Sequence, residues 1–111
     1  LDLKFGQTKE NELQEAVEGL VECKADRLCQ KTGNVYIEIE SRGKPSGIKV
    51  TKAQYQALCL VVTNRKKDIW VLIPTKILKK IMTKFPIKKG GDNWTSKGHI
   101  IPKAELLNLI V

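Results

Sequence analysis

The sequence predicts an α/β fold, in which a mixed central β-sheet is flanked by helices. Segments with helical and with strand periodicity alternate along the chain in the order α-β-β-α-β-α-β-α. The 111 residues suffice for one compact domain and leave little room for a second, so we expect residues 1–111 to form a single domain. The composition, 41% hydrophobic and 29% charged residues, is typical of a globular protein that folds in water.

The first predicted element is an amphipathic helix over residues 8–20. Its apolar residues recur at helical spacing, at Leu13, Ala16, Val17 and Leu20. A rotation of about 100° per residue places Glu10 and Glu12 at the borders of this apolar stripe. Among the acids of this helix, we therefore expect this pair to be able to face a site that adjoins the core.

Two segments with alternating polar and apolar residues follow, at 21–26 and 34–40. Turn residues at 31–33 separate them, so we expect two strands paired as a hairpin. Side chains in a strand alternate between two faces, and those of Val35, Ile37 and Ile39 should share the face opposite to the polar one.

The polar faces of these two predicted strands carry several acidic residues. Period 2 places Glu22, Lys24 and Asp26 on one face of the first strand. It likewise places Tyr36, Glu38 and Glu40 on one face of the second. If the strands are neighbours, the carboxylates of both can meet in one cleft.

The rest of the chain alternates between predicted helices and strands. We expect an apolar helix over 51–62 and a central strand over 69–73, covered on both faces because its apolar run is continuous and includes Trp70. A basic helix over 76–84, a short strand over 99–101 and a last helix from Lys103 complete the order.

Positive charge is concentrated in the second half of the chain. The formal net charge is +8, and residues 64–103 carry eleven Lys and Arg against only Asp68 and Asp92. Such a surface attracts polyanions, nucleic acid first, because binding releases condensed counterions. We expect residues 64–89, Lys66 and Lys67 among them, to grip a nucleic-acid backbone; the alternative is a solvated lysine face that maintains solubility.

The cysteines argue against a disulfide framework or a zinc site. Cys23, Cys29 and Cys59 are odd in number and follow no metal-ligand spacing, and His99 is the only histidine. We expect three small buried hydrophobic residues in a reducing cytoplasm rather than a Cys–His catalytic pair. No apolar stretch approaches the roughly 18 to 20 residues that cross a bilayer, and the start of the chain has no apolar signal core.

Carboxylates that meet in one cleft could bind a metal ion. Asp26, Glu38 and Glu40 could together bind a hard divalent cation such as Mg²⁺ or Mn²⁺, which takes oxygen ligands. Such an ion lowers the pKa of a bound water and stabilises charge on a phosphate. The alternative is a solvent-facing strand with surface ion pairs, each worth about 0 to 1 kcal/mol.

This arrangement resembles the PD-(D/E)XK nuclease superfamily. The likeness starts from Asp26 and the following Glu38-Ile39-Glu40, with an acid on a preceding helix. In detail the chain is similar to small phage and prophage nucleases of that superfamily, from about Lys4 to Leu106. The stretches that carry this likeness are "KFGQTKE", "VECKADR", "TGNVYIEIESRGKPSGIKVTKAQY" and "GGDNWTSKGHIIPKAEL".

The resemblance implies roles for particular residues. Asp26 and Glu38 correspond to the main metal ligands, and Glu10 to the acid of the helix, where the helical geometry also allows Glu12. Glu40 stands where the superfamily normally has a lysine. The positive charge beside the phosphate would then come from a lysine elsewhere in the chain.

Two lysines are candidates for that displaced charge. Lys44 in the GKPSG loop is the first and Lys24, which shares the face of Asp26, is the second. Ser46 and Gly47 would let the loop backbone approach a phosphate. The residues expected to bind nucleic acid are thus Lys24, Arg42, Lys44, Ser46, Lys66 and Lys67.

The resemblance implies a restriction-endonuclease-like fold and a divalent-metal-dependent endonuclease or exonuclease, acting on DNA in phage or mobile-element processing in the host cytoplasm. One alternative is a binding module of the same fold without turnover. Another is a basic adaptor that docks on an acidic protein. RNA as substrate and a homodimer are left open, and Trp94 is a better candidate than Trp70 for stacking on bases.

Overall fold

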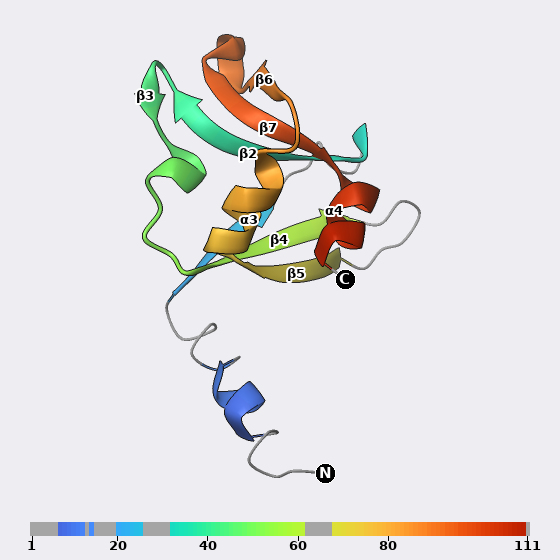
Figure 1. Ribbon diagram of the computed structural model, residues 1–111. Coiled ribbons are helices and arrows are strands. Elements are labelled where there is room, and N and C mark those ends of the chain that lie inside the picture. The colour runs from blue at the N-terminus through green and yellow to red at the C-terminus, as the bar shows by residue number, and fades with distance from the viewer. Residues whose placement is uncertain (1–6, 13, 15–19, 26–31, 62–67, 111) are drawn as a thin grey trace.

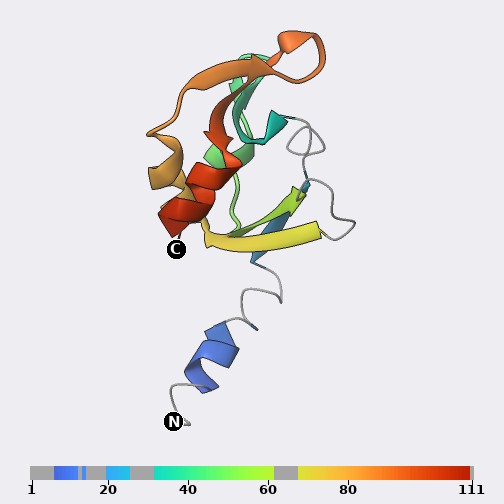
Figure 2. The ribbon, with the colours of Figure 1, turned by 90° about the vertical axis from the view of Figure 1, so that its right-hand side faces the viewer.

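The structure, a computed structural model, describes residues 7–12, 14, 20–25, 32–61 and 68–110. Its architecture is mixed α/β, with two sheets in place of the single expected one (Figure 1). The three-stranded sheet has the order β1-β4-β5, and the four-stranded sheet the order β3-β2-β7-β6. In Figure 2 the two sheets lie one above the other, with α3 and α4 beside them.

The three-stranded sheet combines a parallel and an antiparallel pair. Its strands are β1 (Val21–Ala25), β4 (Tyr55–Val61) and β5 (Asp68–Pro74). β1 runs parallel to β4, and β5 runs antiparallel to β4. The helix expected over 51–62 is therefore wrong, because residues 55–61 are a central strand. This run is almost continuously apolar, so its periodicity does not distinguish a strand from a buried helix, and pairing on both sides decides for the strand.

The expected hairpin between the first two strands is also wrong. The four-stranded sheet consists of β2 (Asn34–Ser41), β3 (Lys44–Pro45), β6 (Ile87–Gly90) and β7 (Ser96–Pro102). β2 pairs antiparallel with β3 and β7, whereas β1 belongs to the other sheet. Alternation of polar and apolar residues fixes the faces of a strand, but it does not choose the partner.

β5 is an edge strand of its sheet and is not covered on both faces as expected. Ile73 is 2% exposed, whereas Trp70 is 52% and Leu72 37% exposed. Trp70 and Leu72 share the face that points away from the core, since side chains two residues apart lie on the same side of a strand. Trp70 is thus a surface residue and not the core residue that its apolar neighbours suggested.

The core lies between the inner faces of the two sheets. The helix α3 (Thr75–Met82) confirms the basic helix expected there and contributes Leu78 and Ile81 to the core. The helix α4 (Lys103–Ile110) begins where the sequence predicted and buries Leu106. The other members of the core include Val35, Ile37, Ile48, Leu58, Leu60, Ile73 and Ile101.

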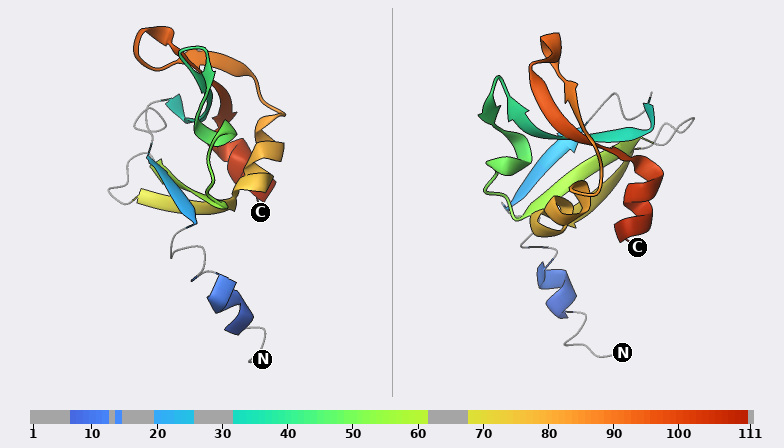
Figure 3. Two further views of the ribbon diagram at one scale, coloured as in Figure 1. Left: turned by 90° about the vertical axis from the view of Figure 1, so that its left-hand side faces the viewer. Right: turned by 45° about the horizontal axis from the view of Figure 1, so that its top comes forward.

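The described part of the first predicted helix is helical at residues 7–12. These residues are exposed, and the segment lies beyond the three-stranded sheet, away from β2 (Figure 3). Within the described part of the chain, every helix is too short or too polar to cross a membrane.

Adjacent residues of β5 test the alternation between a buried and an open face. We expect Ile73→Ala to lower the free energy of unfolding by about 2–5 kcal/mol, because it leaves a cavity in the core. The matched change Leu72→Ala should cost about 1 kcal/mol or less, since that side chain is partly solvated. Urea unfolding followed by circular dichroism measures both, and equal losses would contradict the placement of β5.

Candidate functional site

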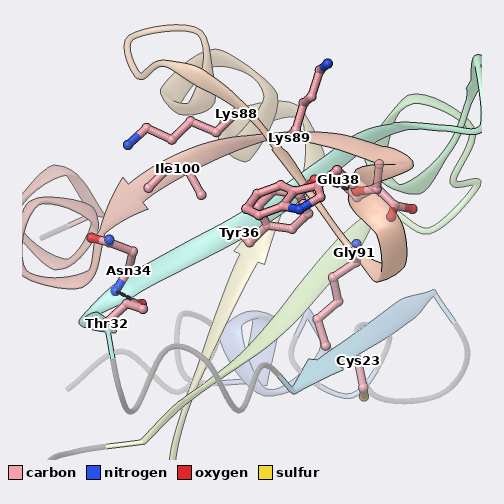
Figure 4. Close-up of a pocket in the computed structure, with 13 residues that line it drawn as sticks. Cys23, Thr32, Asn34, Tyr36, Glu38, Lys88, Lys89, Gly91 and Ile100 are labelled. Carbon is pink, nitrogen blue, oxygen red and sulfur yellow. Dashed lines mark hydrogen bonds between the residues drawn. The ribbon is translucent and has the colours of Figure 1, made fainter.

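A pocket of about 790 Å³ lies between β1 and the four-stranded sheet (Figure 4). Its walls combine residues from four strands, from the segment that joins β6 to β7 and from the residues just before β2. The lining residues are Cys23, Lys24, Thr32, Asn34, Tyr36, Glu38, Lys88, Lys89, Gly90, Gly91, Trp94, Ser96 and Ile100. The lining thus includes three lysines, one glutamate and two aromatic residues.

The alternation of β2 brings Tyr36 and Glu38 to this pocket. Val35 and Ile37 are buried in the core, and the residues between and after them line the pocket on the opposite face. Apolar residues at every second position force the polar set to the other side of the sheet. The predicted shared face of Tyr36 and Glu38 is therefore confirmed.

Glu40 does not follow Glu38 to the pocket, because a β-bulge interrupts the register between them. Glu38 lies opposite Gly98, but Glu40 lies opposite Lys97, the adjacent residue of β7. Since paired residues point to the same side of a sheet and adjacent residues to opposite sides, Glu40 faces away from Glu38. The prediction that both share one face is wrong. Glu40 instead forms a surface ion pair with Lys97, at 3.4 Å between Oε2 and Nζ.

The carboxylate of Glu38 is held by the loop that follows the next turn. The hydroxyl of Ser46 donates a hydrogen bond to its Oε2 at 3.0 Å, and the backbone N–H of Ser46 donates to the carbonyl of Ile39 at 3.0 Å. Gly47 has φ 55°, and a Cβ there would lie 2.3 Å from the carbonyl oxygen of Glu38. Only glycine allows this close approach, so the Ser-Gly pair serves to position Glu38.

The turn between β2 and β3 carries the two basic residues that follow the acids. Arg42 and Gly43 form a two-residue loop, with φ 52° and 78°, and positive φ values at both positions suit the twist of a hairpin. The Arg42 N–H donates to the carbonyl of Thr95 at 2.8 Å. Both Arg42 and Lys44 are exposed, and neither lines the pocket. Of the two candidate lysines, Lys24 lines the same pocket as Glu38.

Tyr36 lies flat across the neighbouring strands. A Cβ on Gly98 would lie 2.6 Å from its Cζ, and a Cβ on Gly90 would lie 2.9 Å from the same atom. The absence of side chains at both glycines therefore makes room for the ring. The Tyr36 hydroxyl is hydrogen-bonded to the hydroxyl of Ser96, which fixes the outer end of the ring.

Several predicted site residues lie outside this pocket. Glu10 is exposed on the N-terminal helical segment, which lies away from β2 (Figure 3), and Glu12 pairs with Lys9 at 3.3 Å. Three further predicted site residues, Asp26, Lys66 and Lys67, lie outside the described residues. Among the residues that the structure does describe, no group of three His, Cys, Asp or Glu side chains could hold a metal ion.

The structure describes two of the three cysteines and the single histidine of the chain. Cys23 is exposed and lines the pocket, which corrects the expectation of a buried residue, whereas Cys59 is buried as expected. Cys29 lies outside the described residues. His99 is buried opposite Ile37, on the core side of β7, and its Nδ1 lies 2.8 Å from the carbonyl oxygen of Phe85.

Several residues that line the pocket were not predicted from the sequence. Asn34 is the first residue of β2 and Thr32 lies just before it, and neither belongs to a motif that the sequence analysis recognised. The hydroxyl of Thr32 accepts a hydrogen bond from the N–H of Asn34 at 3.2 Å. β6, with Lys88 and Lys89, was expected only as part of a basic segment. The glycines that end it, Gly90 and Gly91, were the available signal for a turn between paired strands.

The pocket therefore combines positive charge with aromatic and amide groups. Lysines attract phosphate, aromatic rings stack on bases, and an amide can donate to and accept from a base edge. This combination suits a nucleic acid or a nucleotide. Comparisons with family models, with curated proteins and with solved structures found no match for the chain.

The packing of Tyr36 on Gly90 can be tested by a double-mutant cycle. We expect Gly90→Ala to cost about 1–3 kcal/mol of stability, because the new methyl group collides with a ring that Gly98 and Ser96 hold in place. In a Tyr36→Ala background the same change should cost little, since the nearest atoms are all in Tyr36. Urea unfolding of the four proteins measures this coupling, and additive effects would contradict the geometry.

Proposed function

We propose that this protein is a divalent-metal-dependent nuclease with a restriction-endonuclease-like fold, which hydrolyses phosphodiester bonds of DNA at the pocket beside Glu38. One observation carries the proposal. Glu38, which the resemblance to PD-(D/E)XK nucleases makes a metal ligand, lines one pocket together with Lys24. A carboxylate beside a lysine provides a cation ligand and a phosphate partner at one place.

The remaining charge around the pocket favours a polyanionic substrate. Lys88 and Lys89 are exposed, and both line the same pocket as Glu38. Contacts between lysines and phosphates are independent of sequence, so they position a strand without selecting a base. DNA would be held by its backbone while a scissile phosphate lies near Glu38.

The metal requirement is only partly met by the described residues. Glu38 supplies one oxygen ligand, and its orientation is maintained by Ser46. Asp26, the second predicted ligand, directly follows Ala25, the last residue of β1, and Lys24 of that strand lines the pocket. Mg²⁺ or Mn²⁺, when bound, would activate a water and neutralise developing charge on the phosphate.

The side chains of this chain then have separate tasks. Lys24 would hold a phosphate oxygen as a point charge. Glu38 would bind the cation through the oxygen that Ser46 leaves available. Glu40, on the other side of the sheet, would take no direct part, in contrast to the role that the motif suggests for it.

A second candidate is a nucleic-acid-binding module without turnover. It is favoured by the bulge after Glu38, because this diverts Glu40 and leaves Glu38 as the one carboxylate among the described residues that line the pocket. A single carboxylate binds a hard cation weakly. The two candidates differ in metal-dependent cleavage and agree in binding.

A cleavage assay with matched acidic variants tests the nuclease. We expect purified protein to nick plasmid DNA with Mg²⁺ or Mn²⁺ and to lose this activity in a chelator. Glu38→Gln and Asp26→Asn should lower the rate by about 100-fold or more, since each removes a charge at the reacting phosphate. Glu40→Gln is the control, and we expect its rate to stay within about tenfold of the unchanged protein.

The outcomes separate the two candidates. Loss of cleavage in Glu38→Gln with retention in Glu40→Gln supports the nuclease. Binding of DNA without metal-dependent nicking supports the binding module. Full activity in Glu38→Gln would contradict both the assignment of the acid and the position of the site.

The salt dependence of binding tests the lysines separately. We expect Lys88→Ala to weaken DNA binding for every sequence and to reduce the slope of log K against log salt by about 0.9, the value for one phosphate contact. Lys52 is exposed but does not line the pocket, so Lys52→Ala should leave the slope unchanged. Fluorescence anisotropy over a series of salt concentrations measures both slopes, and equal slopes for the two variants would contradict this binding surface.

A further inference from the structure

We infer that the pocket receives an unpaired base, so that the substrate presents a single-stranded segment and not an uninterrupted duplex. This inference rests on the proposed function and narrows it. The two aromatic residues of the pocket, Tyr36 and Trp94, are the features that point to a base.

Tyr36 forms one platform of the pocket. Its ring covers the backbone of Gly90 and Gly98 and is hydrogen-bonded to Ser96, so it is held in one orientation. A fixed aromatic ring with one side against the sheet can offer its other side to a base. Base–aromatic stacking contributes about 1–3 kcal/mol per base and does not depend on which base is stacked.

Trp94 forms the second aromatic group and is 72% exposed, more than any other large apolar residue that the structure describes. Its backbone and that of Asn93 have φ values of 57° and 56°, a left-handed conformation that non-glycine residues rarely adopt. Its N–H donates to the carbonyl of Gly91 at 3.3 Å, which closes the turn. The turn thus presents an indole ring at the pocket without burying it in the core, as expected for a group that a ligand covers.

The polar groups of the pocket complement a nucleotide. Asn34 can pair with a base edge through its amide, and Lys24 and Lys88 carry the charge for the flanking phosphates. The volume of about 790 Å³ lies within the range of small-molecule sites. A base inside a duplex has both faces stacked and its pairing edge occupied, so only an unpaired base can use these groups together.

The two tryptophans of the chain allow a direct test. Trp70 is 52% exposed on β5 and does not line the pocket, so it is a matched control for Trp94. Trp70→Phe leaves Trp94 as the only indole, and Trp94→Phe leaves Trp70. Each protein is titrated in a chelator, which prevents cleavage, with an oligothymidylate and with a duplex of equal length.

We expect the oligothymidylate to quench the fluorescence of Trp94 in the Trp70→Phe protein and to leave that of Trp70 in the Trp94→Phe protein unchanged. Trp94→Ala should weaken single-strand binding about tenfold, corresponding to the loss of one stacked base, and Trp70→Ala should not. The duplex should bind more weakly and without quenching. Alkylation of Cys23, followed by peptide mass mapping, should slow when the single strand is bound, because the thiol lines the same pocket.

The contrary outcomes are distinct. Equal binding of both nucleic acids, with no quenching of Trp94 and no effect of Trp94→Ala, would overturn the inference while the nuclease proposal survives through its cleavage assay. Absence of binding to either nucleic acid, together with absence of metal-dependent nicking, would overturn the proposed function and the inference with it.

Discussion

The structure depends above all on the alternation of β2 between a buried and an open face. Val35 and Ile37 enter the core that α3, β4 and β7 complete, and this burial fixes the strand in its sheet. Tyr36 and Glu38 are then directed to the opposite side. A change of register by one residue would exchange the two sets, so the same burial that stabilises the core also positions the pocket.

The bulge after Glu38 separates the two glutamates of the acidic motif onto opposite faces of the strand. Two glutamates at i and i+2 would share a face in a regular strand, but the extra residue sends Glu40 towards Lys97 on the other side. The loop then returns, and Ser46 and Gly47 pack against Glu38. The stretch from Glu38 to Gly47 therefore separates the carboxylate of Glu38 from that of Glu40 and holds Glu38 in one orientation.

Glycine has a second role in the four-stranded sheet. Gly90 and Gly98 weaken two strands, since each lacks a side chain to pack, and both instead make room for the ring of Tyr36. The next turn, with Asn93 and Trp94 in left-handed conformations, places an indole beside that ring's pocket. The polar face of the sheet thus carries two aromatic side chains at one pocket, at some cost in sheet stability.

The sequence by itself determined the mixed α/β class, the α3 and α4 helices and the shared face of Tyr36 and Glu38, because each follows from periodicity within one segment. Only the tertiary structure decided that residues 55–61 form a strand, that β1 and β2 lie in different sheets and that Glu40 turns away. The physical reason is that strand pairing and bulges depend on partners distant in the chain, and a local pattern of hydrophobicity contains no information about which partner burial will favour.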